Sequence, residues 1–185
     1  MENKSKLGMV LFLISEATFF IFLILAYVYF HYSVIKGPTA TNSLDPVKSG
    51  IYSLFLLSSS FTLWRAEKHL QRGNKAGLCT WLFVTILFGG IFLAGQGLEY
   101  LHLFHDQVTI SRNLFGTTFF TLTGFHGLHV LLGLIILTVV LGLALAGDFT
   151  GPESSGPVGT IALYWHFVDA VWVVIFSVVY LWAFL

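Results

Sequence analysis

Long apolar runs separated by short polar breaks make up most of this 185-residue chain. A helix needs about 20 such residues to cross a hydrocarbon core of about 30 Å. The shortest run lies between Lys48 and Arg65, and as a helix it would still rise about 26 Å. The runs predict five transmembrane helices, near Leu7–Tyr32, Val47–Trp64, Ala76–Leu98, Leu114–Ala146 and Val158–Leu185. The pattern therefore predicts an all-α fold, with a single polytopic membrane helix bundle over residues 1–185.

Composition supports this interpretation and excludes several classes of function. Hydrophobic residues make up 56% of the chain and charged residues only 10%, and a soluble domain could not bury that much apolar surface. Nine basic residues balance nine acidic ones, so nucleic acid is not an expected partner. The single cysteine, Cys79, excludes an internal disulfide and a cysteine-based metal cluster.

Basic residues are distributed unequally between the two sides of the predicted bundle. Five spans place the termini on opposite sides, with six basic residues on the N-terminal side and three on the other. The six are Lys4, Lys6, Arg65, Lys68, Arg72 and Lys75, and the three are Lys36, Lys48 and Arg112. The positive-inside rule then predicts a cytoplasmic N-terminus and a C-terminus outside.

Ionisable side chains within or beside the apolar runs are the candidates for function. A carboxyl group at membrane depth is costly unless it is paired, protonated or facing a polar interior. Glu16 lies near the middle of the first run, and His126 and His129 lie at similar depth in the fourth, three residues apart on one face. We therefore predict a buried polar or proton-related network of Glu16, Glu99, His126, His129, His166 and Asp169.

Each signal has a structural and a chemical interpretation. His126 and His129 could ligate a metal or haem, but one helix does not supply the opposed ligands of a bundle haem, and di-iron sites repeat Glu-x-x-His on paired helices. Interhelical hydrogen bonding is favoured, with Glu16 paired to His126 first and to His129 as second choice. A direct proton-transfer role fits Glu16 equally well. A helix–helix clamp is favoured for His166 and Asp169, and no catalytic, cofactor-binding or metal-ligating residue is predicted.

Small residues predict where the helix backbones approach closely. Gly124 and Gly127 flank His126, and Gly90 with Ala94 forms a small-x-x-x-small step. Steps of this kind let membrane helices pack tightly where lipid supplies no hydrophobic driving force.

A family resemblance is carried by four segments, LISEATFFIFLILAYVYFHYS, GQGLEY, TGFHGLHVLLGLIIL and YWHFVDAVWVVIFSVVYLW. In this order they span essentially the whole chain, and they resemble the cytochrome c oxidase subunit III family of haem–copper oxidases. The resemblance implies that Glu16 is the intramembrane glutamate that reacts with carbodiimides in family members. It also places His126 and His129 on the two motif histidines, Glu99 on the glutamate that ends the third helix here, and His166 and Asp169 on the last-helix motif.

The same resemblance implies a function and its setting. The chain would be a non-catalytic core subunit of a proton-pumping terminal oxidase, which reduces O2 to water with electrons from cytochrome c. It would hold no haem or copper itself and would pack against catalytic subunit I and subunit II, which carry those cofactors. It would bind phospholipid and support proton uptake and stable turnover. The expected setting is a hetero-oligomeric respiratory complex, or a supercomplex, in a bacterial plasma membrane.

Two departures from longer family members limit what is carried over. The chain starts at what would be their third helix, so another subunit would supply two helices or the lipid-holding cleft would be open. GDFTGPESSGPVGTIAL replaces a basic, histidine-rich segment, so no phosphate-binding residues are assigned there. Three alternatives stay open: a quinol oxidase, a haem-binding electron carrier using His126, His129 and His166, and a small transporter or proton channel built around Glu16 and Asp169.

Overall fold

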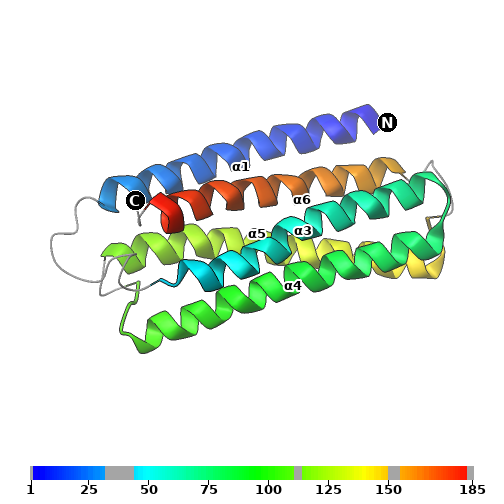
Figure 1. Cartoon of the computed structure of the whole chain (residues 1–185). Coiled ribbons are helices and arrows are strands. Elements are labelled where there is room, and N and C mark those ends of the chain that lie inside the picture. The colour runs from blue at the N-terminus through cyan, green and yellow to red at the C-terminus, as the bar shows by residue number, and fades with distance from the viewer. Residues whose placement is uncertain (1, 32–43, 111–113, 150–154, 183–185) are drawn as a thin grey trace.

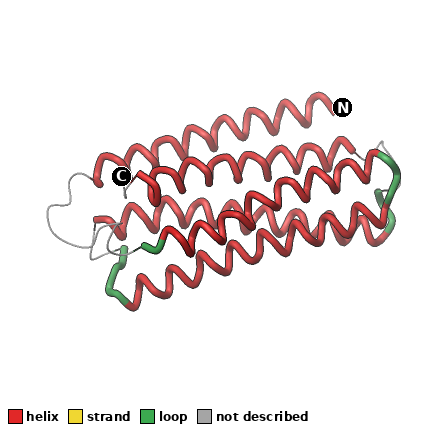
Figure 2. The backbone as a smooth tube through the Cα atoms, viewed as in Figure 1, coloured by secondary structure: helices red, strands yellow, loops and turns green. Residues whose placement is uncertain are grey.

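The computed structural model describes residues 2–31, 44–110, 114–149 and 155–182, and these ranges contain five long helices (Figure 1). The helices are α1 (Glu2–His31), α3 (Pro46–Gln71), α4 (Lys75–His105), α5 (Leu114–Ala146) and α6 (Ser155–Phe176), and a π-helical segment, η2 (Ser177–Leu181), continues α6. Figure 2 shows the described loops as short turns at the two ends of the bundle. Within the described ranges the fold is all-helical, as predicted.

The five helices form an up-and-down bundle in which successive helices run in opposite directions (Figure 1). α3, α4, α5 and α6 form a ring in which each helix packs against two others of the ring, and α1 packs on the outside against α5 and α6. α1 begins at one end of the bundle and η2 finishes at the opposite end (Figure 1).

Two helices end later than the apolar pattern predicts. α3 continues to Gln71 rather than ending at Trp64, and α4 continues to His105 rather than ending at Leu98. The predicted ends are those of membrane spans, because a break in hydropathy marks where a helix meets a polar environment, whereas backbone hydrogen bonding decides where the helix stops. The segment after Trp64, RAEKHLQ, consists mainly of good helix formers and continues the helix in a polar form.

Four of the five helices are long and apolar enough to cross a membrane, over Lys6–Phe30, Lys75–His105, Leu114–Ala146 and Gly156–Leu181. The prediction of transmembrane helices is therefore confirmed for these four. α3 is long enough but less apolar than these four helices, because serines interrupt it and charged residues follow Trp64. The predicted helix ends at Tyr32 and Leu185 lie outside the described residues.

Close helix packing surrounds Trp165 of α6, whose side chain is fully buried. A Cβ added at Gly89 of α4 would lie 2.9 Å from the indole Cη2, and one at Gly133 of α5 would lie 2.7 Å from Cε3. Trp165 therefore occupies space between α4 and α5 that exists only because both positions are glycine.

The glycines predicted to mediate close approach are not the ones that do so. A Cβ at Gly90 would meet no described atom within 4 Å, and a Cβ at Gly124 or Gly127 would meet its nearest neighbour at an ordinary 3.8 Å. Consecutive residues point about 100° apart around a helix. The rotation of α4 therefore turns Gly89 toward Trp165 and Gly90 away from it, which the sequence spacing did not reveal.

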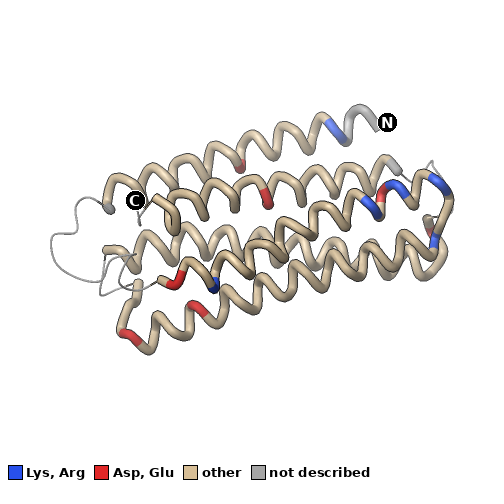
Figure 3. The backbone as a smooth tube through the Cα atoms, viewed as in Figure 1, with Lys and Arg blue, Asp and Glu red and all other residues tan. Residues whose placement is uncertain are grey.

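Charged residues gather at the two ends of the bundle (Figure 3). The end where α1 and α4 begin holds five basic residues whose side chains are described, in addition to Lys4 of α1, and in the described ranges the other end holds Lys48. Two basic residues of the predicted asymmetry, Lys36 and Arg112, lie outside the described residues. The five at the first end are Lys6, Arg65, Lys68, Arg72 and Lys75.

Candidate functional site

Glu16 of α1 and His129 of α5 form an interhelical pair, with 3.1 Å between Oε2 and Nε2. The His129 Nδ1–H donates to the Phe125 carbonyl at 2.7 Å, since a carbonyl oxygen can only accept. With Nδ1 protonated, Nε2 of a neutral ring is an acceptor, so its bond to Glu16 requires one further proton. That proton either makes Glu16 a carboxylic acid or makes His129 an imidazolium. The two residues therefore hold one proton between them.

His126, the first-choice partner for Glu16, is in a different place, and that prediction was wrong. Its ring is 1% exposed and stacks on Trp172, with 4.9 Å between ring centroids. The rings of Phe20 and Phe92 approach it edge-on at 6.3 and 6.1 Å. Neither ring nitrogen has a hydrogen-bond partner among the described residues. Side chains three residues apart point about 60° apart, so α5 directs one histidine toward α1 and the other into the core.

Glu99 accepts hydrogen bonds from three elements. Ser49 of α3 donates to Oε1 at 2.7 Å, while Tyr180 of η2 and Gln96 of α4 donate to Oε2 at 2.7 and 3.2 Å. The Tyr180 side chain is fully buried. The Glu99 carboxyl group therefore ties together the start of α3, the end of α4 and the π-helical end of α6.

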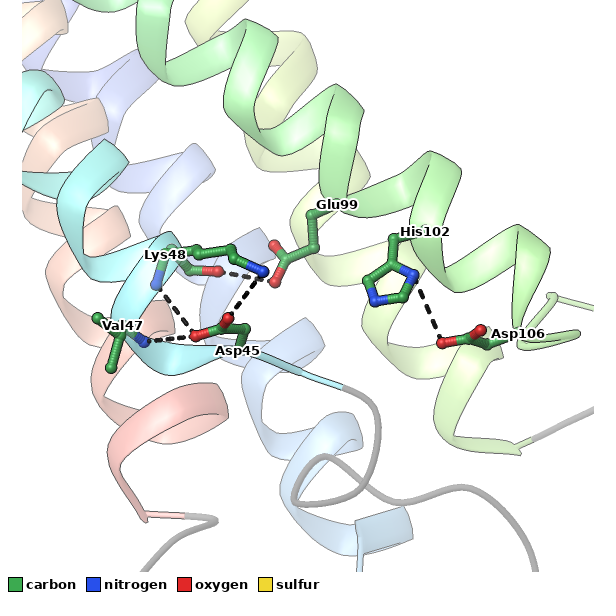
Figure 4. A network of polar contacts seen from close by, with 7 residues as sticks. Asp45, Val47, Lys48, Glu99, His102 and Asp106 are labelled. Atoms are coloured by element: carbon green, nitrogen blue, oxygen red, sulfur yellow. Dashed lines mark hydrogen bonds and ion pairs between the residues drawn. The ribbon is translucent and has the colours of Figure 1, made fainter.

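A pocket of about 250 Å³ opens beside Glu99, and Asp45, Lys48 and His102 contribute to its wall (Figure 4). Asp45 caps α3 by accepting from the backbone N–H groups of Val47 and Lys48 at 3.1 and 3.2 Å. The hydrogen bond from the Lys48 backbone, followed by that from its ammonium group, lowers the pKa of Asp45. A carboxylate at this position fixes the start of α3 beside Glu99.

Serines of α3 accept hydrogen bonds from both large indoles of α6. Trp165 Nε1 donates to Ser59 at 2.9 Å, and Trp172 Nε1 donates to Ser53 at 2.8 Å. The two serines donate their own hydrogens to carbonyl groups of the preceding turn of α3. The residues that lower the hydropathy of α3 are thus used inside the bundle, where polar groups need partners.

His166 and Asp169 of α6 meet at a third serine of α3. Ser60 Oγ donates to Asp169 Oδ2 and lies 2.9 Å from His166 Nδ1. The Asp169 side chain is 4% exposed, and its other oxygen, Oδ1, is buried with no hydrogen-bond partner among the described residues. These contacts join α3 to α6 through a hydroxyl group.

The predicted network is divided into separate clusters, and none of them resembles a metal centre. Within the described ranges, no group of three or more His, Cys, Asp and Glu side chains is placed to hold a metal ion. Both ring nitrogens of His129 are engaged in hydrogen bonds, and aromatic rings enclose His126. What the clusters offer chemically is hydrogen bonding between helices and the holding of protons.

Sequence reasoning missed the hydroxyl partners of these ionisable groups. Ser60 and Tyr180 complete the clusters of Asp169 and Glu99, and neither was singled out. One signal was available, because residues 58–60 form a run of three serines inside an otherwise apolar stretch. A run of this kind in a membrane helix indicates a face that bonds to a neighbouring helix. For Tyr180, placed near a span end, interfacial anchoring is equally compatible with the sequence.

Comparison with known families and proteins gives one consistent result. The family model described as Cytochrome c oxidase subunit III matches residues 1–184. The chain is 40% identical over 176 residues to Cytochrome c oxidase subunit 3 of Synechocystis sp., covering 94% of this chain and 74% of that protein. It is 35% identical over 180 residues to a Probable cytochrome c oxidase subunit 3 of Nocardia farcinica, covering 96% and 88%. Its identity to Cytochrome c oxidase subunit 3 of Scyliorhinus canicula is 36% over 190 residues, covering 98% and 70%.

Proposed function

This chain belongs to the cytochrome c oxidase subunit III family, and from that premise we propose that it is a non-catalytic core subunit of a proton-pumping terminal oxidase. The oxidase reduces O2 to water with electrons from cytochrome c. The chain packs against catalytic subunit I and subunit II, which carry the haem and copper, and it stabilises subunit I, its lipids and its proton uptake. The match over residues 1–184 is the observation that carries this proposal.

The side-chain arrangement supports an accessory rather than a catalytic role. The Glu16–His129 pair joins α1 to the ring of four helices, and Glu99 joins three elements at one end of the bundle. Groups that bond to each other across helices stiffen a bundle. The proton held between Glu16 and His129 can also pass from one group to the other, because both groups bind protons and their atoms lie within hydrogen-bond distance. The pair therefore acts as an interhelical tie and as a local proton buffer.

Substitution of Glu16 by Gln tests the accessory role. The amide can still donate to Nε2 of a neutral His129, so we expect the complex to assemble with unchanged haem spectra. Initial oxidase activity should stay within about twofold of wild type, which corresponds to less than about 0.5 kcal/mol in the barrier. Stability and sustained turnover should fall modestly. The measurement is O2 consumption over many turnovers by the purified complex, with Thr18→Ala on the same helix as the control.

Three outcomes would contradict the proposal, each in a different way. Loss of all activity in a fully assembled Glu16→Gln complex would contradict the accessory role. Turnover with quinol but not with cytochrome c would place the complex among quinol oxidases. A Soret band from the chain purified alone would indicate a haem-binding electron carrier.

We further propose that α3 is a fifth span, with the α1 start in the cytoplasm and η2 toward the outside of a bacterial plasma membrane. The inward-facing serines support a spanning α3, because their hydroxyl groups have partners inside the bundle. The five described basic residues at the end where α1 begins support the orientation.

Thiol labelling at the two ends of α3 tests both statements. In a Cys79→Ser background, we expect an impermeant maleimide to label Val47→Cys in intact spheroplasts and Arg72→Cys only after the membrane is opened. Both positions are exposed, so access should depend on sidedness alone. Labelling of both from one side would show that α3 does not cross, and the reverse pattern would invert the orientation.

A further inference from the structure

Three side chains on the seam between α3 and α6 form a continuous hydrogen-bonded chain. His166 and Asp169 lie one turn apart on α6, and Ser60 of α3 contacts the Nδ1 of the first and the Oδ2 of the second. Asp169 lies about 21 Å along α6 from its first residue, near the middle of the bundle. The two ends differ in access, because Asp169 is 4% exposed whereas His166 is only partly buried.

The hydroxyl group of Ser60 sets the direction of donation along the hydrogen bonds from His166 to Asp169. A serine has one hydrogen to donate and lone pairs that accept. If Ser60 donates to a carboxylate at Asp169, then the Nδ1–H of His166 donates to Ser60. If Asp169 is a carboxylic acid that donates to Ser60, then Ser60 donates to an unprotonated Nδ1. Both arrangements satisfy the same three heavy-atom positions, so neither requires a side chain to move.

We propose that His166, Ser60 and Asp169 together form a binding site for one proton in the middle of the bundle. When the site takes up a proton, it exists as imidazolium with carboxylate or as neutral imidazole with carboxylic acid. In passing from the first form to the second, the Nδ1–H bond breaks as that proton joins Ser60 Oγ. The original Ser60 O–H bond breaks as its proton joins Asp169 Oδ2. Charge and atoms balance, and the site returns the proton by the reverse step.

The unpartnered oxygen of Asp169 supports storage of the proton at the buried end. Oδ1 is enclosed and has no hydrogen-bond partner among the described residues. Burying an oxygen without a hydrogen-bond partner costs less free energy in a neutral carboxylic acid than in a carboxylate, because the charge of a carboxylate is spread over both oxygens. Protons enter and leave through His166, which lies one turn nearer than Asp169 to the start of α6 at the basic end of the bundle, and Asp169 holds them.

Other ionisable groups on the helices around α6 set the electrostatic surroundings. α1 contributes Glu16, and α5 contributes His126 and His129. On α3, Glu67 lies seven residues from Ser60, or about 10 Å along the helix. The Glu67 Oε1 lies 3.4 Å from the position of a Cβ at Gly159 of α6, and burial raises its pKa. Glu67 thus places a carboxyl group at the basic end of the same seam, on the side from which protons would arrive.

Infrared spectroscopy of the full-length chain, purified with whatever subunits accompany it, tests the site without reference to oxidase activity. We expect a pH-dependent C=O stretching band of a protonated carboxyl group that is absent from Asp169→Asn. In His166→Asn, which keeps a hydrogen-bonding group near Nδ1 but cannot take a proton, the midpoint of this band should move to higher pH by about one unit, a tenfold change in proton affinity. The carboxyl group then holds alone the proton that it otherwise shares.

The role of Ser60 is isolated by a double-mutant comparison. In a Ser60→Ala background the His166→Asn shift should fall to less than about a third of its size, because the link between the two groups is removed. Ser59→Ala, which removes a neighbouring serine that bonds to Trp165, is the control for loss of packing. In this background the midpoint of the band should still move by the full amount when His166 is replaced by Asn. If Asp169→Asn removes no band, or if the His166→Asn shift is the same with and without the Ser60 hydroxyl, the assignment is wrong.

Discussion

Replacing Gly89 by valine is expected to destabilise the bundle by about 1–3 kcal/mol, the usual cost of overpacking a filled core. The new Cβ would lie 2.9 Å from Trp165 Cη2 and 2.9 Å from Leu134 Cδ2. The indole cannot swing away cheaply, because its Nε1–H is bonded to Ser59 and its opposite edge faces Gly133. The measurement is the loss of the folded chain from detergent-solubilised membranes on heating.

Gly90→Val is the matched control for this experiment. It makes the same substitution one residue later in α4, so any change in helix propensity is shared, but its Cβ meets no described atom within 4 Å. We expect its stability to stay within about 0.5 kcal/mol of wild type. In a Gly89→Val background, Trp165→Leu should recover part of the loss, because the smaller side chain leaves room for the valine. Equal effects of the two valines would show that Trp165 does not pack against α4 in this way.

The sequence predicted the helices well because their signal is long and local. Apolar runs of this length have few alternatives to membrane helices, and all five appear where the runs occur. It also predicted that Glu16 would meet a histidine of α5, but it selected His126 over His129. The choice between residues 60° apart depends on how α5 is rotated against α1 and α6, and that rotation is set by packing at distant contacts such as Trp165 against Gly133.

The hydroxyl partners were harder to predict for a related reason. Ser53, Ser59 and Ser60 lie on parts of α3 that face α6 only once the register between the two helices is fixed. In the linear sequence, the same serines interrupt an apolar run and lower its hydropathy. In the bundle they bond to two indoles and to one oxygen of a buried carboxyl group. Low hydropathy in α3 therefore reflects many internal hydrogen bonds rather than poor fit to the bundle.

Glu99→Ala is expected to loosen one end of the bundle, at a cost of about 4–6 kcal/mol. Three hydrogen bonds are lost, each worth roughly 1 kcal/mol net, and the buried Tyr180 hydroxyl is left without its acceptor at a further cost of about 1–3 kcal/mol. Tyr180→Phe removes the donor together with the bond, so its cost should be only about 1 kcal/mol. The two substitutions thus separate the loss of a bond from the creation of an orphaned polar group.

Hydrogen exchange gives the sharper readout of the Glu99→Ala effect, because the elements that Glu99 joins are known. Backbone amides at the start of α3 and in η2 should exchange faster in Glu99→Ala, while those around Trp165, in the opposite half of the bundle, should keep their protection. Asp106→Ala is the control, because its carboxyl group lies at the same end of α4 but is 45% exposed and makes only weak contacts with two histidines at 3.6 and 3.7 Å. Exposed pairs of this kind contribute about 0–1 kcal/mol. If both variants exchange alike, Glu99 does not tie α3 to η2. If exchange rises throughout the bundle, the three bonds support the whole fold rather than one end of it.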